Sequence, residues 1–271
     1  MNYLRRIIEL WARGKTFKRK LNVGGKIVPL IISPDAQLKY LKSGSEGFDR
    51  DLIAIAELFL KRDSNVWDVG ANVGVFTFAA AVIAKEGSVV SFEADTWLVG
   101  LLRRTRNLPA FKDFNIRILP VALSGKDGVA TFQVAKRGRA SSSLESAGGR
   151  SQMGGIREKQ DVPTLKIDTL LKSLEAPDFI KIDVEGAELM VLNGAPNVIH
   201  RVRPIFYIEV SRESQREIFE LFKDANYLSY THGFKIIDDT ENVSSNVYFV
   251  PEEKVDFYKE ASASCASSKI S

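Results

Sequence analysis

From residue 66 onward, short apolar runs with the character of β-strands alternate with longer stretches that have helical periodicity. Strands are expected at 66–69, 88–93, 116–122, 179–183 and 204–210, and helices at 75–84, 97–107, 187–192 and 213–226. Strands separated by helices of about 10–15 residues are typical of βαβ units that build a parallel, doubly wound sheet. The sequence therefore predicts an α/β fold with a mostly parallel sheet.

The segments outside this alternation are less regular. A hairpin is expected at 21–33 around Gly24-Gly25, a helix at 49–61, a strand at 129–135, and an antiparallel edge made by 227–230 and 246–250. The polar, Gly/Ser-rich segment 135–160 is too long for an ordinary connection, so it is expected to be a mobile lid or an Ω-type loop. Residues 261–271 are small and polar, which predicts a frayed tail.

The positive charge of the chain belongs to its first 20 residues. The 271 residues carry a formal net charge of +4, but residues 1–20 hold seven Lys/Arg against Glu9, so this arm carries +6 and the remainder −2. Leu4, Ile7, Ile8 and Trp11 recur at helical spacing. Such a helix could lie on an anionic membrane surface, although packing on its own domain or on a partner subunit is commoner.

Cysteine and histidine are too scarce for several kinds of site. Cys265 is the single cysteine, and His200 and His232 are the two histidines. These numbers exclude an intramolecular disulfide, a cysteine zinc site and a histidine-rich metal site, and they favour a reducing compartment. No apolar run reaches the roughly 18 residues of a transmembrane helix. We therefore expect a cytoplasmic protein, with contact to the inner membrane surface through residues 1–20 as an open alternative.

The strongest local motif is the stretch VWDVGANVG at 66–74, which reads as a strand, a glycine-rich turn and the start of a helix. In open α/β sheets such a turn binds a nucleotide over the first backbone amides of the helix. The dinucleotide fingerprint would need glycines at positions 70, 72 and 75, but positions 72 and 75 hold Asn72 and Val75. A phosphate-binding loop would need a Lys directly after Gly74, where this chain has Val75. Asp68 would repel a pyrophosphate but would favour a ligand with a cationic amine.

A second acid strengthens this interpretation. Glu93 closes the second strand, 23 positions after Gly70, where a carboxylate can accept two hydrogen bonds from a ribose diol. An acidic turn combined with a ribose-binding acid favours S-adenosylmethionine over NAD. The alternative is a plain tight turn without a ligand.

Several further segments recur in one order along the chain. They are DVGANVGVFTFAAA, SFEAD followed by Asn107, PVALSGKDGVATF, SSSL, LKIDTLL, PDFIKIDVEGAELMVLNGA, RPIFYIEV and NVYFVP. This series resembles the FkbM family of S-adenosylmethionine-dependent methyltransferases over about residues 44–251. The family more often has proline after the FE dipeptide, where this chain has Ala94.

The resemblance implies a class I methyltransferase fold with a seven-stranded sheet, and methyl transfer to hydroxyl groups of sugars or other secondary metabolites. It divides the chain into a basic arm and hairpin (1–43), a methyltransferase domain (44–251) and a C-terminal segment (252–271). The candidate cofactor contacts are Asp68, Gly70, Asn72 and Gly74 at the methionine end, Glu93 at the ribose, Val121 and Ala122 at the adenine edge, and in addition Phe76, Thr77, Ala94 and Asp183.

A second acidic cluster, in FIKIDVEGAELMVL, supplies the candidate catalytic residues. Asp183 ends an apolar strand and would face the crevice at the switch point of the sheet, where it could stabilise the sulfonium or accept a proton. Lys181 lies on the same side of that strand. Glu185 is a further catalytic candidate, or else it satisfies the free amides of the following helix, which also carries Glu188.

His232 is the candidate general base, or else a turn histidine bonded to backbone, whereas His200 at a helix end is expected to be structural. Asp183 and Glu209 could hold a divalent cation, but two carboxylates are weak grounds and we assign no metal ligand.

Three functions remain open at this stage. The first is methyl transfer to a small-molecule or glycan acceptor, and the alternatives are a nicotinamide-dependent oxidoreductase and a non-catalytic nucleoside-binding module. No basic stripe interleaved with aromatic residues occurs in the body of the chain, so we expect no nucleic-acid partner.

Overall fold

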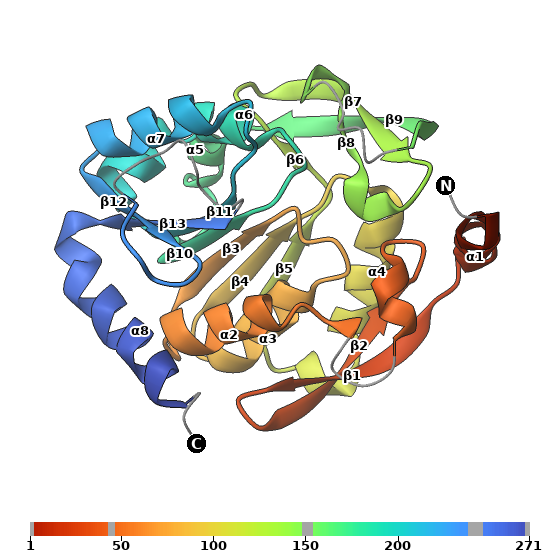
Figure 1. The fold of residues 1–271 in the computed structure, drawn as a ribbon, viewed down its shortest axis with the longest axis horizontal. Helices are drawn as coiled ribbons and strands as arrows, with labels where there is room; N and C mark the ends of the chain where they lie inside the picture. Colours follow the sequence, from red (N-terminus) through yellow and green to blue (C-terminus); the bar gives the residue numbers. More distant parts are fainter. Residues whose placement is uncertain (1–2, 43–46, 148–153, 238–245, 269–271) are drawn as a thin grey trace.

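The computed structural model describes residues 3–42, 47–147, 154–237 and 246–268. A seven-stranded sheet forms its centre (Figure 1), with the order β12-β13-β11-β10-β3-β4-β5. The strands are β3 (Asn65–Val69), β4 (Ser88–Phe92), β5 (Ile116–Leu119), β10 (Phe179–Ile182), β11 (Ile205–Glu209), β12 (Tyr227–Thr231) and β13 (Asn246–Pro251). This arrangement confirms the class I methyltransferase-like, mostly parallel α/β fold.

The reversed strand of this sheet is β13. It pairs antiparallel with both β11 and β12, so β12 at the edge runs in the same direction as the parallel strands. The antiparallel strand therefore lies one position in from the edge. The order of the parallel strands reverses between β3 and β10, which is the switch point where doubly wound sheets bind ligands.

Helices cover both faces of the sheet (Figure 1). One face packs against α2 (Arg50–Phe59), α3 (Val75–Ile83), α4 (Thr96–Arg106) and α8 (Val255–Ser268), and the other against α5 (Ile167–Leu170), α6 (Glu188–Asn193) and α7 (Gln215–Asp224). Along β3, Val66 belongs to the first core and Trp67 to the second, as the alternation of side chains along a strand requires. Because both faces are buried, the inner strands are mostly apolar, and Asp68 of β3 and Lys181 of β10 are buried exceptions that pair with each other.

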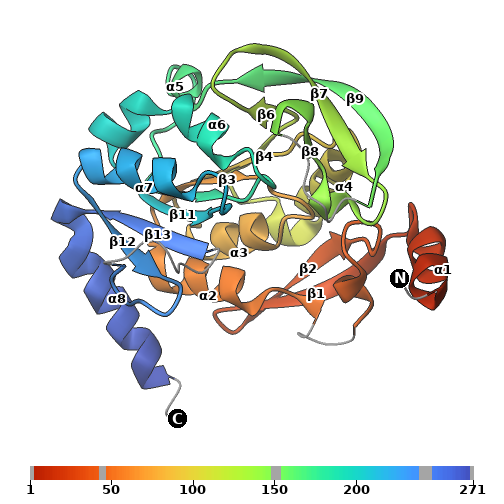
Figure 2. The ribbon, with the colours of Figure 1, turned by 45° about the horizontal axis from the view of Figure 1, so that its top comes forward.

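The N-terminal segment forms a helix and a hairpin. The expected hairpin is β1 (Phe17–Val23) and β2 (Lys26–Ile32), which turn through Gly24 and Gly25, both with positive φ. The amphipathic helix α1 (Tyr3–Ala12) stands at the periphery of the molecule (Figure 2). The basic residues at 18–20 lie in β1 rather than in α1, so the arm is not one continuous helix.

A smaller sheet, ordered β6-β9-β7-β8, covers the carboxyl ends of β4 and β5. Its strands are β6 (Ala122–Leu123), β7 (Gly128–Ala135), β8 (Ser143–Leu144) and β9 (Ile156–Leu165). The strand expected at 116–122 is therefore two strands, β5 and β6, and Pro120, which has no N–H to donate, lies in the break between them.

Two expectations about loops are wrong. Segment 135–160 includes a 3₁₀ turn at Arg139–Ser141, strand β8, a second 3₁₀ turn at Glu145–Ala147 and the start of β9, and residues 148–153 lie outside the described part. At the C-terminus, a 3₁₀ turn (Glu252–Lys254) leads into α8, which continues to Ser268 where a frayed tail was expected. Tyr258 of α8 stacks on Phe59 of α2 at 5.2 Å, so apolar contact holds the start of this helix on the body.

The remaining short elements are 3₁₀ turns at Leu38–Leu41 (η1) and Pro109–Phe111, and one π-helical turn at Val198–Val202 that contains His200. Among the helices that the structure describes, none has the length and apolarity needed to cross a bilayer.

Candidate active site

The turn after β3 brings the chain close to the end of β10. Gly70 has φ +75°, and a Cβ at this position would lie 1.9 Å from the carbonyl oxygen of Asp183. The backbone amides of Gly70 and Ala71 both donate to the carbonyl of Phe92 at the end of β4. Only glycine allows this approach without moving a strand, so Gly70 fixes the distance between the two strand ends at the switch point.

The second half of the turn starts α3. Gly74 caps this helix with φ +88°, and a Cβ there would come within 2.6 Å of the side chains of Leu102 and Phe78. Asn72, also left-handed at φ +54°, donates its backbone amide to Glu93 at 2.7 Å. The buried Oδ1 atom of Asn72 has no hydrogen-bond partner among the residues that the structure describes. A buried unpaired acceptor in the wall of a cavity fits a ligand that brings a donor.

Glu93 is held in place from two sides. One carboxylate oxygen accepts the amide of Asn72 and the other accepts the amide of Asp95 at 2.9 Å. Each oxygen keeps a lone pair, so the group can still accept two hydroxyl hydrogens. Burial raises the pKa of Glu93 to about 7, against the opposing effect of the two amide hydrogen bonds.

Lys181 joins the ends of β3 and β10. Its ammonium group donates to the carbonyl of Gly70 at 2.8 Å and lies 3.2 Å from Asp68 and 3.6 Å from Asp183. Burial opposes its charge, but the two carboxylates outweigh burial and raise the pKa of Lys181 above its ordinary value. Thr77 donates to the second oxygen of Asp68 at 2.6 Å. The fully buried carboxylate of Asp68 is thus already paired.

These contacts correct part of the expected cofactor set. Asp68, Thr77 and Gly74 do not line the cavity. Asp68 and Thr77 are buried beneath the turn and stabilise it from outside the cavity. An amine of a ligand therefore has no access to Asp68, because Lys181 occupies that role. The exposed carboxylate at this point is Asp183, whose side chain is 38% exposed.

The other acids of the cluster differ in position. Glu185 has φ +52° and lines the cavity. Glu188 is fully buried in the first turn of α6, where it accepts the amide of Gly186 at 2.8 Å. Glu188 thus satisfies a backbone amide just before the helix, which is the kind of role that was the alternative for Glu185.

A cavity of about 300 Å³ lies over this turn and has an apolar inner end and a polar mouth. The inner end is apolar, and Val121 and Ala122 stand in its wall as expected, together with Phe92, Leu123, Phe132 and Leu144. Gly70, Asn72, Phe76, Glu93, Ala94, Lys181 and Asp183 line its middle. The mouth is lined by Lys39, Tyr40, Asp49, Asp51, Tyr207, Glu209 and Asn246. The volume is at the lower limit of those of ligand pockets.

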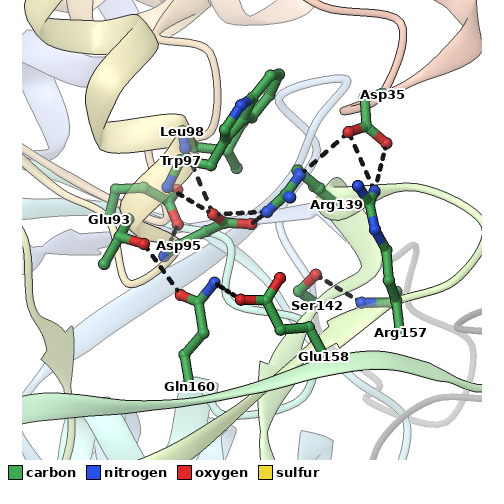
Figure 3. A network of polar contacts seen from close by, with 12 residues as sticks. Asp35, Glu93, Asp95, Trp97, Leu98, Arg139, Ser142, Arg157, Glu158 and Gln160 are labelled. Carbon is green, nitrogen blue, oxygen red and sulfur yellow. Dashed lines mark hydrogen bonds and ion pairs between the residues drawn. The ribbon is translucent and has the colours of Figure 1, made fainter. Parts of the chain in front are cut away.

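The segment that was expected to be a lid forms one wall of this cavity. Arg139 is buried and donates to both oxygens of Asp95, at 2.9 and 2.6 Å, and to Asp35 at 3.3 Å, as Figure 3 shows. Its guanidinium lies 4.8 Å from the ring centre of Trp97, and Arg157 pairs with Asp35 at 2.8 Å. This network ties the small sheet to the segment after β2 and to the first turn of α4. Ala140, Ser142 and Leu144 thereby face the cavity.

The histidines behave differently from each other. His200 lies in the π-helical turn, away from the cavity. His232 does not line the cavity, but its Nδ1 atom is 3.4 Å from the hydroxyl of Tyr207, and its Nε2 atom is 3.3 Å from Asp51. Within the described residues, no group of three or more His, Cys, Asp or Glu side chains is placed to hold a metal ion.

Apart from Glu209, sequence reasoning did not identify the residues at the mouth. Tyr40 and Tyr207 belong to segments without a motif. Asp49 and Asp51 lie at the start of a helix, where acids are common as caps, and Asp49 does cap α2 by accepting the amide of Asp51. The only available signal was the alternation in β11, which puts Tyr207 on the face opposite the apolar Phe206 and Ile208.

Comparisons with known proteins agree with this geometry. The family model described as the methyltransferase FkbM domain matches residues 68–234. The hexuronic acid methyltransferase AglP of Haloferax volcanii is 24% identical over 182 residues, which cover 65% of this chain and 69% of that protein.

Two solved structures are also similar. One is the methyltransferase FkbM from Methylobacillus flagellatus, with 17% identity, a TM-score of 0.46 and coverage of 70% of this chain and 44% of that one. The chain thus spans less than half the length of that protein. The other is a SAM-dependent O-methyltransferase from Thermotoga maritima, with 10% identity, a TM-score of 0.43 and coverage of 85% and 76%.

Proposed function

This chain belongs to the family of methyltransferases that carry the FkbM domain, and on that premise we propose that it methylates a hydroxyl group of a sugar, a glycan or a secondary metabolite. The mouth of the cavity carries this proposal. Tyr40 and Tyr207 offer aromatic surface and hydroxyls. The acidic side chains of the mouth offer hydrogen-bond acceptors, and Asn246 offers both a donor and an acceptor. Such a mixture binds the hydroxyls and the apolar faces of a polyol.

The charge of the mouth disfavours other acceptors. Asp49, Asp51 and Glu209 line it, and Asp183 is partly exposed in the same cavity. Lys39 is the one cationic side chain among the described residues of the mouth, whereas Lys181 and Arg139 of the cavity wall are buried and paired with carboxylates. A nucleic-acid backbone, with one negative charge per phosphate, would be repelled by these carboxylates. The curated relative is named for a hexuronic acid, which supports a sugar acceptor. A sugar acid would place its carboxylate beside Lys39.

The cavity fits S-adenosylmethionine, which supplies a reactive methyl sulfonium when bound. Glu93 would accept both ribose hydroxyls, and Val121, Ala122 and Leu144 would pack against the adenine. Asn72 would take a donor from the methionine end with its unpaired Oδ1 atom. Asp183 would face the positive sulfur, and Lys181, held by Asp68, would orient Asp183 rather than touch the acceptor.

Most of the rate enhancement then comes from position. Methyl transfer needs the acceptor oxygen in line with the methyl carbon and water excluded, and such alignment contributes up to about 7–11 kcal/mol. The wall that Arg139 fixes is suited to this exclusion, because its apolar residues close one side of the cavity. Glu185 at the rim would contact the acceptor.

Titration calorimetry with S-adenosylmethionine tests the cofactor assignment. We expect binding to the wild type, much weaker binding to Glu93→Ala, and unchanged binding to the control Glu175→Ala, which alters an exposed acid outside the cavity. Undiminished binding to Glu93→Ala would refute the assignment. Binding of NAD(H) in place of S-adenosylmethionine would support the oxidoreductase instead.

Transfer from a methyl-labelled donor tests the activity. The acceptors are a panel of neutral sugars, sugar acids, glycans and glycolipids, with RNA as the contrasting polyanion. We expect label on a sugar hydroxyl, lost in Asp183→Ala and kept in Glu175→Ala. Cofactor binding without transfer to any hydroxyl acceptor would identify a non-catalytic module, and label on RNA would overturn the acceptor class.

The location of the enzyme follows from α1 in this proposal. Ile7, Leu10 and Trp11 are 46–50% exposed on a helix that also carries Arg5 and Arg6. An exposed apolar stripe flanked by bases is suited to the surface of an anionic bilayer. We therefore assign the protein to the cytoplasmic side of a membrane, where a glycolipid acceptor would be within reach.

A further inference from the structure

Methylation of a neutral hydroxyl releases a proton, and the cavity must provide a route for it. Asp183 faces the reacting atoms in the proposed function, but it is also 3.6 Å from the Lys181 ammonium and opposite the sulfonium charge. A group that both stabilises a cation and removes a proton would lose the first role on protonation. The proton therefore needs a different acceptor.

Three residues from three elements form a chain that leads out of the mouth. Tyr207 on β11 is buried and lines the cavity. Its hydroxyl is 3.4 Å from Nδ1 of His232, in the turn after β12, and Nε2 of His232 is 3.3 Å from a carboxylate oxygen of Asp51 in the first turn of α2. The imidazole is 38% exposed and Asp51 63% exposed, so the chain runs from the buried tyrosine to solvent.

The contacts indicate where the protons of the relay lie. The carboxylate of Asp51 can only accept and lies 3.3 Å from Nε2, which favours the tautomer with its proton on Nε2 and leaves Nδ1 as an acceptor. The hydroxyl of Tyr207 then donates to Nδ1. Its oxygen keeps a lone pair toward the cavity, where it can accept the hydrogen of the acceptor hydroxyl.

We propose that Tyr207, His232 and Asp51 form a proton relay that removes the hydroxyl proton of the methyl acceptor. The inference rests on the proposed function and names the residues that receive its proton. Tyr207 is the group that touches the acceptor, whereas His232 and Asp51 act through it.

The step balances in atoms and charge. The acceptor oxygen forms a bond to the methyl carbon as the carbon–sulfur bond breaks. The electron pair of the broken carbon–sulfur bond stays on sulfur. Tyr207 takes the hydroxyl proton while it gives its own proton to Nδ1 of His232. One positive charge disappears at sulfur and one appears on the imidazolium, next to Asp51, and His232 passes its proton to water.

The surroundings explain why the two proton movements must be coupled. Burial raises the pKa of Tyr207, and Asp49, Asp51, Asp183 and Glu209 raise it further. A free Tyr207 phenolate is therefore disfavoured. Asp51 stands beside the imidazole of His232, where it would pair with an imidazolium, and the ring centre of Tyr248 on β13 lies 6.3 Å from that of the imidazole. The charge consequently moves through Tyr207 without staying on it.

Imidazole ¹⁵N NMR of the full chain without ligands tests the hydrogen bonds. His200 and His232 are the two histidines, so His200→Gln assigns the spectrum. We expect His232 as the Nε2–H tautomer, a changed Nδ1 resonance in Tyr207→Phe, and a changed Nε2 resonance in Asp51→Asn, because the Nε2–H group loses its carboxylate partner. A predominant Nδ1–H tautomer, or a His232 signal unaffected by both variants, would overturn the relay.

The rate profile tests the role in catalysis, on the acceptor that the labelled transfer identifies. Because Nδ1 must be unprotonated, wild-type kcat is expected to fall as pH falls through the imidazole pKa. In His232→Gln and Tyr207→Phe we expect kcat to drop by about 10²-fold or more, the acidic limb to vanish, and the affinity for S-adenosylmethionine to persist. His200→Gln is the matched control and keeps the wild-type profile.

The two hypotheses fail in different ways. If the wild type neither binds S-adenosylmethionine nor transfers its methyl group, the proposed function fails and the NMR result still decides the hydrogen-bonded chain. If the wild type transfers label and His232→Gln does so at the same rate with the same pH profile, the relay is refuted and the methyltransferase stands.

Discussion

At the end of β4, the pKa of Glu93 is raised to about 7 by burial, and this makes cofactor binding sensitive to pH. In the proposed complex, the ionised carboxylate would accept two ribose hydroxyls, whereas the protonated group would lose one acceptor. We expect the affinity for S-adenosylmethionine to be lost as pH falls through this pKa, and to be about tenfold weaker one unit below it than on the alkaline plateau.

The variant Glu93→Gln isolates this effect. It keeps the shape of the side chain but removes the titration, so its affinity should be lower than the wild-type plateau by roughly 10–100-fold and independent of pH. Calorimetry at pH values one unit below and one above 7 measures both proteins, with Glu175→Gln as the control. A pH dependence that survives in Glu93→Gln would assign it to another group.

The residues that could be predicted from sequence are those in local motifs. Gly70, Asn72, Glu93 and Asp183 line the cavity as their positions at strand ends indicated. The role of Asp68 could not be predicted, because its charge is neutralised by Lys181, which is distant in sequence and adjacent only through the pairing of β3 with β10. A motif gives the position of a side chain but not its partner.

Most of the mouth residues were missed for a related reason. Tyr40, Asp51 and Tyr207 come from three separate segments, and none of them has a fixed spacing to another or to His232, which contacts Tyr207. His232 was a candidate base on chemical grounds alone. Its connection to the cavity depends on Tyr207, which sequence reasoning treated as part of an apolar strand.

At the scale of elements, the network around Arg139 holds the small sheet on the body. Arg139→Met removes the cation while keeping much of the apolar stem. Asp35 keeps its ion pair with Arg157, but the buried carboxylate of Asp95 loses its cationic partner. We expect a loss of about 3–5 kcal/mol in the free energy of unfolding. The affinity for S-adenosylmethionine should fall as well, because Asp95 also donates its amide to Glu93.

Urea unfolding followed by circular dichroism measures the change. The matched control is Arg62→Met, which breaks the exposed pair between Arg62 and Glu86 and should alter stability little, because solvent screens such pairs. Arg139→Lys should recover part of the loss. Equal stability of Arg139→Met and Arg62→Met would show that the network does not hold the sheet.

The same network explains which elements could be predicted. Periodicity identified the strands and helices of the central sheet, because both faces are buried and apolarity decides them. Segment 135–160 has the composition of a loop, yet Arg139, Ser142 and Ser143 are buried. The guanidinium of Arg139 is satisfied by the distant carboxylates of Asp35 and Asp95, and composition does not reveal that pairing.

For the whole molecule, the separation of charge is the feature with the widest consequence. The mouth of the cavity is acidic, and the excess of positive charge is confined to residues 1–20. Arg5 of α1, Lys39 and Arg137 line a second hollow beside the mouth, and Gln37, Lys39 and Ala140 are shared between the two. A surface bound by α1 would therefore lie next to the entrance for the acceptor.

Binding to lipid vesicles tests this orientation. We expect the full chain to sediment with vesicles that contain phosphatidylglycerol and not with phosphatidylcholine alone, because each basic residue near an anionic surface contributes about 1 kcal/mol. The double variant Leu10→Ser with Trp11→Ser removes the exposed apolar stripe and should weaken binding by about tenfold or more. Raising the salt concentration should also weaken it, since screening shortens the reach of the arm's charge.

The matched control is Ile27→Ser, which alters an equally exposed apolar residue at the start of β2 instead of in α1. It should bind vesicles like the wild type, and all three proteins should keep the same affinity for S-adenosylmethionine, because none of the changes touches the cavity. Sedimentation of the Leu10/Trp11 double variant at the wild-type level would refute membrane contact through α1. Equal loss in Ile27→Ser would mean that general surface apolarity, rather than this helix, drives the binding.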